Sequence, residues 1–284
     1  MRQHRLAPLL THCLRGTNKN IFYAQYKMAS LSLTVGVPVA VVDGGKDDKK
    51  LLYMDAEYPG DDPINEINLR DNGVFSPLPG VQEHMIDRVF ISGATGCGKS
   101  TFASSYLKMY KRLNPKRRIV IFSILNDDER SGLDDLGAER IKVDSSLLET
   151  EYPITIDDLE GCVVLFDDVD MCTDEKVSKF ILKLIEQIIQ TGRHHSIDII
   201  YCNHIINNYR KTKNIIQESN KVVIFPKGGD FKGIKDLLET KMGFKKEFIR
   251  KVFMSGSRWV LINKEYPVYC LTEFGCFIPK TEYN

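Results

Sequence analysis

The stretch "GATGCGKST", residues 93–101, decides the fold of this chain. It follows the apolar run "RVFIS", residues 88–92, and precedes a segment with helical periodicity. The pattern G-x-x-x-x-G-K-[ST] therefore occurs in the strand, loop and helix context that it requires. Glycines in such a loop let the backbone point its N–H groups at an anion. The stretch predicts a phosphate-binding loop at the start of a helix.

Each position of this loop has an expected role toward a nucleotide. Lys99 would reach the β- and γ-phosphates, Ser100 would ligate Mg²⁺, and Thr101 could contact the α-phosphate. We expect ATP and Mg²⁺ as the cofactors. The alternative is a glycine turn that binds nothing, which the surrounding context disfavours. The residues expected to line the phosphates are Gly93, Ala94, Thr95, Gly96, Cys97, Gly98, Lys99, Ser100 and Thr101.

A second stretch, "GCVVLFDDVD", residues 161–170, places two adjacent carboxylates after four apolar residues. Neighbouring carboxylates raise each other's cost of ionising, so a cation is expected beside them. Asp167, at the end of a buried strand, would hold Mg²⁺ together with Ser100. Asp168 would face the other side of the pleat and act as a general base toward the attacking water. The alternative is a strand-ending turn, in which Asp is common.

The order of apolar runs predicts the fold class. From residue 88 onward, strand-length runs alternate with helix-period segments, which is typical of a mainly parallel sheet flanked by helices. We expect one helix from residue 99 to about 113 and a longer one over residues 174–191, with Thr173 as its cap and Gly192 at its end. The fold class is α/β.

Composition shifts divide the chain into four regions. Residues 1–27 contain basic residues and no acidic ones, which fits either a disordered extension or a transit peptide. Residues 28–84 predict a small β-rich region that ends in a connector over residues 61–80. Residues 85–228 predict the core domain. Residues 229–284 predict helices and a β-hairpin packed on that core.

The composition narrows the possible classes of protein. The chain has 284 residues, 43% of them hydrophobic, and a net charge of +1, so it can bury a full core. No apolar run approaches the roughly 20 residues of a membrane span. The seven cysteines lack a C-x-x-C pair, which favours a reducing, intracellular setting. His194, His195, His204 and Cys202 lack a regular ligand spacing, so they do not predict a metal site.

Four segments resemble the FtsK-HerA superfamily of DNA-pumping ATPases, and most closely the virion-packaging ATPases of poxviruses and other nucleocytoplasmic large DNA viruses. They are "GATGCGKST", "VVLFDDVD", "TGRHHSIDIIYCNH" and "KVVIFP", in that order within residues 85–228. The resemblance implies a RecA-like (ASCE) core with Walker A and B motifs. It also implies a homo-oligomeric ring, hexameric or pentameric, that pumps double-stranded DNA into a preformed capsid. Capsid or portal components would then be partners, in the virion or the infected-cell cytoplasm.

The resemblance implies three further site residues. Arg193 matches an arginine that reaches the nucleotide of the neighbouring subunit. Asn203 or His204 matches a polar residue that senses the γ-phosphate; the family often has Thr-Gln there, so which of the two acts stays open. The alternatives are a cation at a helix C-terminus for Arg193 and a plain polar strand end for the other two.

DNA binding and two rival functions complete the expectations. Basic residues outnumber acidic ones over residues 210–251, which fits DNA contact or simply a solvated face. A nucleoside or nucleotide kinase would share the phosphate loop but would need an arginine-rich lid. An ATP-gated scaffold or loader would bind ATP without DNA-stimulated turnover.

Overall fold

The computed structural model describes residues 28–80, 86–126, 131–149, 151, 153–206, 209–228 and 230–279. The expectations for residues 1–27 lie outside this described part. The described strands are β1 (Met28–Ser32), β2 (Val37–Asp43), β3 (Leu51–Tyr58), β4 (Glu66–Asn68), β5 (Val74–Pro77), β6 (Arg88–Ser92), β7 (Ile119–Ser123), β8 (Glu139–Lys142), β9 (Val163–Asp167), β10 (Asp198–Asn203), β11 (Lys221–Ile224), β12 (Val260–Asn263), β13 (Tyr269–Thr272) and β14 (Gly275–Phe277).

Helices connect most of the parallel strands. They are α1 (Lys99–Leu113), α2 (Glu175–Thr191), α3 (Tyr209–Glu218), α4 (Phe231–Asp236) and α5 (Lys246–Met254). Short 3-10 turns lie at Asp134–Leu136, Ser145–Leu148, Asp157–Leu159, Val169–Met171 and Gly192–His195, and a π-helical turn, Leu237–Lys241, continues α4. Within the described residues, no helix has the length and apolar character needed to cross a membrane.

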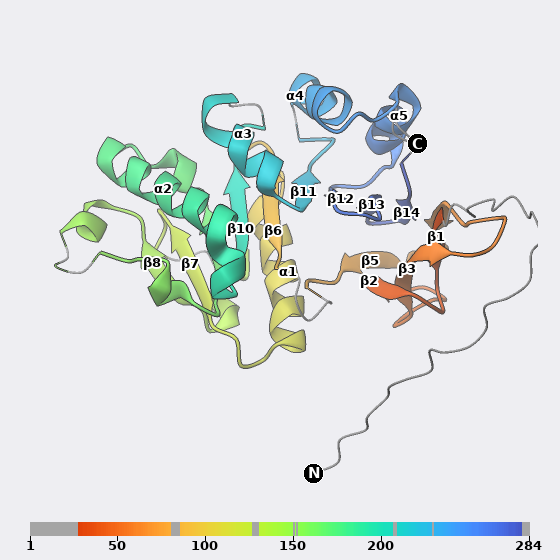
Figure 1. The fold of residues 1–284 in the computed structure, drawn as a ribbon, viewed down its shortest axis with the longest axis horizontal. Helices are drawn as coiled ribbons and strands as arrows, with labels where there is room; N and C mark the ends of the chain where they lie inside the picture. The colour runs from red at the N-terminus through yellow and green to blue at the C-terminus, as the bar shows by residue number, and fades with distance from the viewer. Residues whose placement is uncertain are drawn as a thin grey trace, which may run out of the picture.

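The main sheet has ten strands in the order β4-β14-β13-β12-β11-β6-β10-β9-β7-β8 (Figure 1). From β11 to β8 neighbouring strands are parallel, and from β11 to β4 they are antiparallel. Strand β10 separates β6, which leads into the phosphate loop, from β9, which ends at Asp167. Because these strands are parallel, their carboxyl ends meet at one edge of the sheet. The predicted α/β fold with a mainly parallel core is confirmed.

Two hydrophobic clusters cover the two faces of this sheet. Alternate residues of each strand point to opposite faces, so each apolar run contributes side chains to both clusters. One face packs against α2, α3 and α5, with contacts from Ile188, Ile215 and Val252. The other face packs against α1 and the four-stranded sheet β1-β3-β2-β5, with contacts from Leu107 and Phe75. The small sheet and the core therefore share one hydrophobic cluster.

One segment differs from the sequence-based expectation. The stretch over residues 61–80 is more than a connector, because it supplies β4 to the main sheet and β5 to the small one. A hydrogen bond from the Phe75 N–H to the Glu273 carbonyl, 2.8 Å, ties β5 to the turn after β13. The predicted terminal hairpin is formed by β12 and β13, which continue the main sheet antiparallel to β11 and contribute Val260, Ile262 and Cys270 to a core cluster.

Helix α2 ends where predicted, at Thr191 with Gly192 as its C-cap, but its N-terminal cap differs from the prediction. The cap is Asp174, not Thr173: its carboxylate accepts hydrogen bonds from the N–H groups of Lys176 and Val177. Gly192 does not stop the helix by a left-handed turn, since its φ is −54° and a 3-10 turn continues from it. The chain reverses at Ser196, where φ is +54°.

Candidate nucleotide-binding site

The glycine-rich loop joins β6 to α1 at the carboxyl edge of the main sheet. Gly96 and Gly98 have φ values of +79° and +105°, a region that side chains other than glycine rarely adopt. Gly93 has a different role, because a Cβ there would lie 2.9 Å from the Phe225 ring and 2.5 Å from the Cys97 sulfur. The backbone N–H of Gly93 donates to the Asn203 carbonyl, 3.2 Å, which fixes the loop against β10.

Lys99, Ser100 and Asp167 lie together at this edge, as the sequence predicts. The buried ammonium of Lys99 donates to the carbonyls of Gly93 and Ala94, at 3.0 and 3.4 Å. The Ser100 hydroxyl donates to the Asp167 carboxylate, 3.2 Å, across 67 residues of sequence. Asp167 is only 2% exposed. A hydroxyl and a carboxylate oxygen so placed are the ligands that Mg²⁺ prefers.

Asp168 leaves the strand in a left-handed conformation, with φ +54°. Such strain persists where the surrounding structure enforces it, commonly at functional sites. Its Oδ1 atom lies 3.4 Å from Nε2 of His204 and makes no hydrogen bond among the described residues, although the atom is buried. On its other side, His204 contacts Asp170, with Nδ1 3.1 Å from a carboxylate oxygen. The backbone N–H of His204 also donates to the Asp170 carboxylate, 3.0 Å.

This arrangement brings three possible ligand atoms together in a way that the sequence did not indicate. Asp168, Asp170 and His204 each offer an atom within 4.8 Å of the others. The His204 imidazole lies between the two carboxylates, hydrogen-bonded to Asp170 and 3.4 Å from Asp168 Oδ1. Asp170 was overlooked because its partner is 34 residues away in the chain.

Asn203 ends β10 beside the phosphate loop and is 4% exposed. Its side-chain amide donates to the Tyr201 hydroxyl, 2.6 Å, and its side-chain oxygen accepts from the Ile205 N–H, 2.7 Å. Burial raises the pKa of the Tyr201 hydroxyl well above its usual value, so this partner stays protonated. Asn203 and His204 thus both lie at the edge that carries the loop, Asn203 held rigidly and His204 tied to carboxylates.

Arg193 lies at the opposite, amino edge of the sheet. It is exposed within the 3-10 turn that follows α2. The carbonyl of His195 in this turn accepts from the Gly161 N–H just before β9, 2.9 Å. The length of β9 and β10 therefore separates Arg193 from the phosphate loop of its own chain.

Sequence reasoning missed a set of residues that close over the loop from the C-terminal half of the chain. Phe225 packs against Gly93 and Gly98, and a Cβ at Gly228 would meet the Cys97 side chain at 3.0 Å. Phe225 belongs to the segment "KVVIFP", for which the sequence alone indicated no side-chain role. Burial raises the pKa of the Cys97 thiol, so the thiolate is disfavoured.

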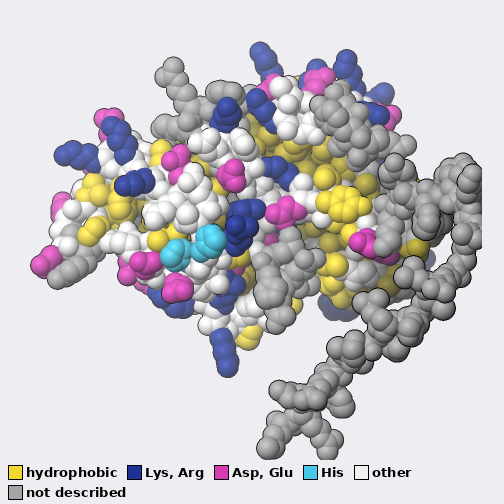
Figure 2. Space-filling model, viewed as in Figure 1, with side chains coloured by type: hydrophobic (Ala, Val, Ile, Leu, Met, Phe, Trp, Pro, Cys, Tyr) yellow, Lys and Arg dark blue, Asp and Glu magenta, His cyan; other side chains and the backbone are white. Residues whose placement is uncertain are grey.

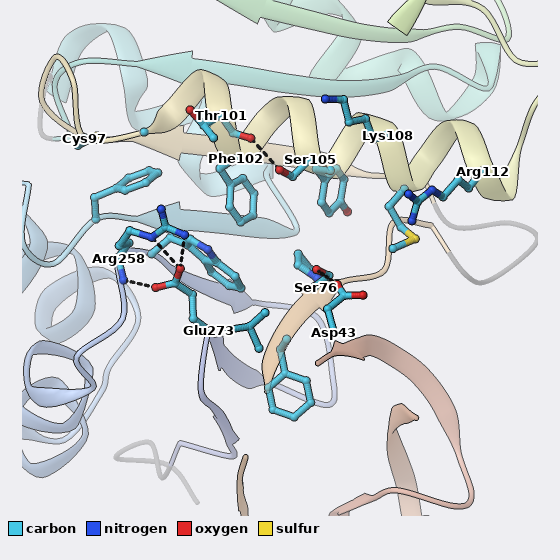
Figure 3. Close-up of a pocket in the computed structure, with 18 residues that line it drawn as sticks. Asp43, Ser76, Cys97, Thr101, Phe102, Ser105, Lys108, Arg112, Arg258 and Glu273 are labelled. Carbon is cyan, nitrogen blue, oxygen red and sulfur yellow. Dashed lines mark hydrogen bonds and ion pairs between the residues drawn. The ribbon is translucent and has the colours of Figure 1, made fainter. Parts of the chain in front are cut away.

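A cavity of about 370 Å³ adjoins the loop at Cys97, Gly98 and Thr101. Figure 3 shows α1 along one side and the side chains of Arg258, Glu273, Ser76 and Asp43 along the other. Its lining comes from the loop, α1, the small sheet and the strands after α5. No local motif marks these residues, because they meet only in the folded chain.

No profile of a known protein family matches the chain. The chain is 35% identical over 240 residues to the uncharacterized protein V3 of the Sputnik virophage, which covers 84% of this chain and 94% of that protein. It belongs to the family of this virophage protein. The family is thus one that occurs in viruses.

Similar solved structures include two viral packaging NTPases. B204, the DNA-packaging ATPase from Sulfolobus Turreted Icosahedral Virus, is 13% identical with a TM-score of 0.46, covering 66% of this chain and 99% of that one. The B204 genome packaging NTPase of Sulfolobus turreted icosahedral virus 2 in complex with ATP-gammaS is 12% identical with a TM-score of 0.42, covering 66% and 98%.

Proposed function

We propose that this chain is a viral ATPase that hydrolyses ATP to move double-stranded DNA into a preformed capsid. The observation that carries the proposal is the 3.2 Å contact between Ser100 and Asp167 beside Lys99. It joins a phosphate loop to a carboxylate at the end of a buried strand, which is the arrangement that holds Mg²⁺ and a nucleoside triphosphate in P-loop NTPases.

The roles of the surrounding residues follow from their positions. Mg²⁺, when bound between Ser100 and Asp167, would neutralise charge on the β- and γ-phosphates. Lys99 would exchange its loop carbonyls for phosphate oxygens. Asp168 would accept a proton from the attacking water, with His204 holding its carboxylate. Asn203, beside the loop, would contact the γ-phosphate from a rigid position.

The position of Arg193 supports hydrolysis at subunit interfaces. Its distance from the loop of its own chain leaves the nucleotide of a neighbouring subunit as its target. An arginine supplied in this way is worth about 10³ to 10⁵ in rate. We propose a homo-oligomeric ring in which each subunit completes the site of the next, and capsid or portal components as its partners.

A basic surface on α4 and α5 supports contact with DNA. Figure 2 shows Lys and Arg side chains that project from the upper side of the molecule, where Figure 1 places α4 and α5 in the same view. The exposed basic residues of this segment are Lys232, Lys235, Lys241, Lys245, Lys246 and Arg250. Contacts of this kind are made to phosphates and weaken steeply with salt.

The decisive test is the ATPase rate with and without duplex DNA, measured over a range of protein concentrations. A ring motor predicts a rate that DNA stimulates and that rises steeply with protein concentration. Stimulation should fall as salt is raised, and the Lys245→Glu/Lys246→Glu variant should show weaker stimulation at low salt and a shallower fall with salt, because it makes fewer phosphate contacts. An ATPase rate that changes with neither DNA nor protein concentration would contradict the proposal. So would a kinase activity toward nucleosides.

A further inference from the structure

The cavity beside the phosphate loop reaches Thr101, the residue expected to contact the α-phosphate. Thr101, in the first turn of α1, lines it together with Cys97 and Gly98. The γ-phosphate must lie at the other end of the triphosphate, near Asp167. The nucleoside is bonded to the α-phosphate. A nucleotide whose α-phosphate lies at Thr101 would therefore place its nucleoside in this cavity.

The cavity has the size and chemistry of a small-molecule pocket. Its volume of about 370 Å³ lies in the range of roughly 300 to 1,000 Å³ that such pockets have. Its floor is aromatic: Phe102 and Trp259 pack edge to face, with ring centres 5.0 Å apart. At the far end, the Ser76 hydroxyl donates to the Asp43 carboxylate, 2.6 Å, which leaves carboxylate oxygen sites for the N–H or O–H groups of a ligand.

A buried carboxylate fixes an arginine at the loop end of this cavity. Glu273, whose side chain is 7% exposed, accepts hydrogen bonds from the backbone N–H of Arg258, 2.6 Å, and from its Nε, 2.8 Å. Arg258 Nη2 lies 2.8 Å from the same carboxylate. The Arg258 side chain is nevertheless 77% exposed, so its remaining donors are available to a ligand. Figure 3 shows the pair beside Cys97.

We propose that this cavity binds the nucleoside of the substrate, and that Arg258, oriented by Glu273, contacts the nucleotide from outside the phosphate loop. The proposal rests on the proposed function, because it assigns the second half of the same ligand. It makes the small N-terminal sheet and the β12–β13 hairpin parts of the nucleotide site. The aromatic floor favours a planar base, and Asp43 favours a base or ribose that can donate hydrogen bonds.

The wild-type chain carries its own probe, because its single tryptophan, Trp259, lines the cavity. Titration with ATP and Mg²⁺ should change the intrinsic tryptophan fluorescence. Inorganic tripolyphosphate with Mg²⁺ should also bind, as measured by calorimetry. Its binding should leave the tryptophan fluorescence unchanged. Equal fluorescence changes with both ligands, or none with bound ATP, would overturn the assignment of the cavity.

A variant whose cavity is filled distinguishes binding of the nucleoside from binding of the phosphates. Ser105, on α1, lines the cavity. Ser105→Trp should weaken ATP binding at least tenfold and leave tripolyphosphate binding within twofold. Ser105→Ala removes the hydrogen bond to the Thr101 carbonyl without filling space and should keep ATP affinity. Gln190→Trp, on the exposed side of α2, controls for the added indole. Unchanged ATP affinity in Ser105→Trp, or an equal loss for both ligands, would overturn the proposal.

Arg258 needs a matched control because it belongs to an ion pair. Arg258→Ala should weaken ATP binding about tenfold, whereas Arg118→Ala, which breaks an exposed arginine–carboxylate pair with Glu139, should not. Thermal melting without nucleotide shows whether each variant is folded. ATP affinity that stays unchanged in folded Arg258→Ala would remove Arg258 from the site. A wild-type chain that binds neither ATP nor tripolyphosphate would instead contradict the proposed function itself.

Discussion

The two edges of the main sheet each hold a pair of aspartates with opposite character. At the carboxyl edge, Asp167 and Asp168 are adjacent in sequence, and Asp168 has a buried oxygen that makes no hydrogen bond within the described part of the chain. At the amino edge, Asp87 and Asp198 are 111 residues apart, and the Asp87 N–H donates to Asp198 Oδ1, 2.6 Å.

The amino-edge pair is surrounded by partners. Asp87 accepts from the Tyr106 hydroxyl, 2.6 Å, and forms an ion pair with Lys221. Asp198 accepts from the Tyr110 hydroxyl and pairs with Arg117, both at 2.7 Å. Groups that are already satisfied stabilise a fold and have little capacity left for a ligand. The two pairs therefore differ in how fully their carboxylates are engaged, and Asp168 keeps the capacity to accept a hydrogen bond from a ligand.

The largest contrast is expected between two lysines, one at each edge. Lys99→Ala should abolish ATP turnover, because no other residue of the loop carries a charge to the β- and γ-phosphates. Lys221→Met should leave turnover per folded molecule nearly unchanged. Steady-state ATPase assays on both variants measure this. Substantial turnover in Lys99→Ala would break the comparison.

Arg193 sharpens the comparison, since it lies at the amino edge yet is assigned to catalysis. Arg193→Ala should lower turnover by about 10³-fold or more while ATP affinity is kept, because the arginine acts on a neighbour's nucleotide. Mixing it with Lys99→Ala subunits should restore part of the activity, since each variant supplies what the other lacks. A normal ATPase rate for Arg193→Ala would mean that Arg193 is only a cation at a helix C-terminus and has no role in catalysis.

The free energy of unfolding should fall more in Lys221→Met than in Lys99→Ala, the reverse of the order expected for ATP turnover. Lys221→Met leaves the buried Asp87 carboxylate without its cation and should lower the free energy of unfolding by about 3 kcal/mol. Lys99→Ala should cost less, because the hydrogen bonds of the Lys99 ammonium go to the neutral carbonyls of Gly93 and Ala94. Denaturant titrations of the two variants decide the matter. Equal losses would mean that both edges are structural.

The smallest expected effect is a pH dependence at the amino edge. Burial, followed by the Asp87 charge, raises the pKa of Asp198 to about 6. Folding therefore favours the protonated carboxyl, and the wild type should gain stability as pH falls from about 7 toward 4. Asp198→Asn cannot titrate and should not show this gain. Thermal melts of both proteins at pH 7.5 and 5 test the difference, and parallel shifts would contradict it.

Much of the site could be predicted because its chemistry is local. The loop at residues 93–101 and the aspartates after β9 are short motifs in which neighbours in sequence are neighbours in space. Helix α1 began and ended where its periodicity indicated. Arg258 and Glu273 escaped prediction, because neither has a local pattern and their meaning depends on the cavity that they share with α1.

The sequence by itself determined the phosphate loop, the alternation of strands and helices from β6 to β11, and the expected pairing of Ser100 with Asp167. Those features depend on backbone angles, apolar periodicity and short spacings. The tertiary structure alone decided that β10 lies between β6 and β9, that the small sheet shares the core of α1, and that Asp87 meets Asp198. These depend on long-range packing, in which residues far apart in the chain are brought together by the burial of apolar surface.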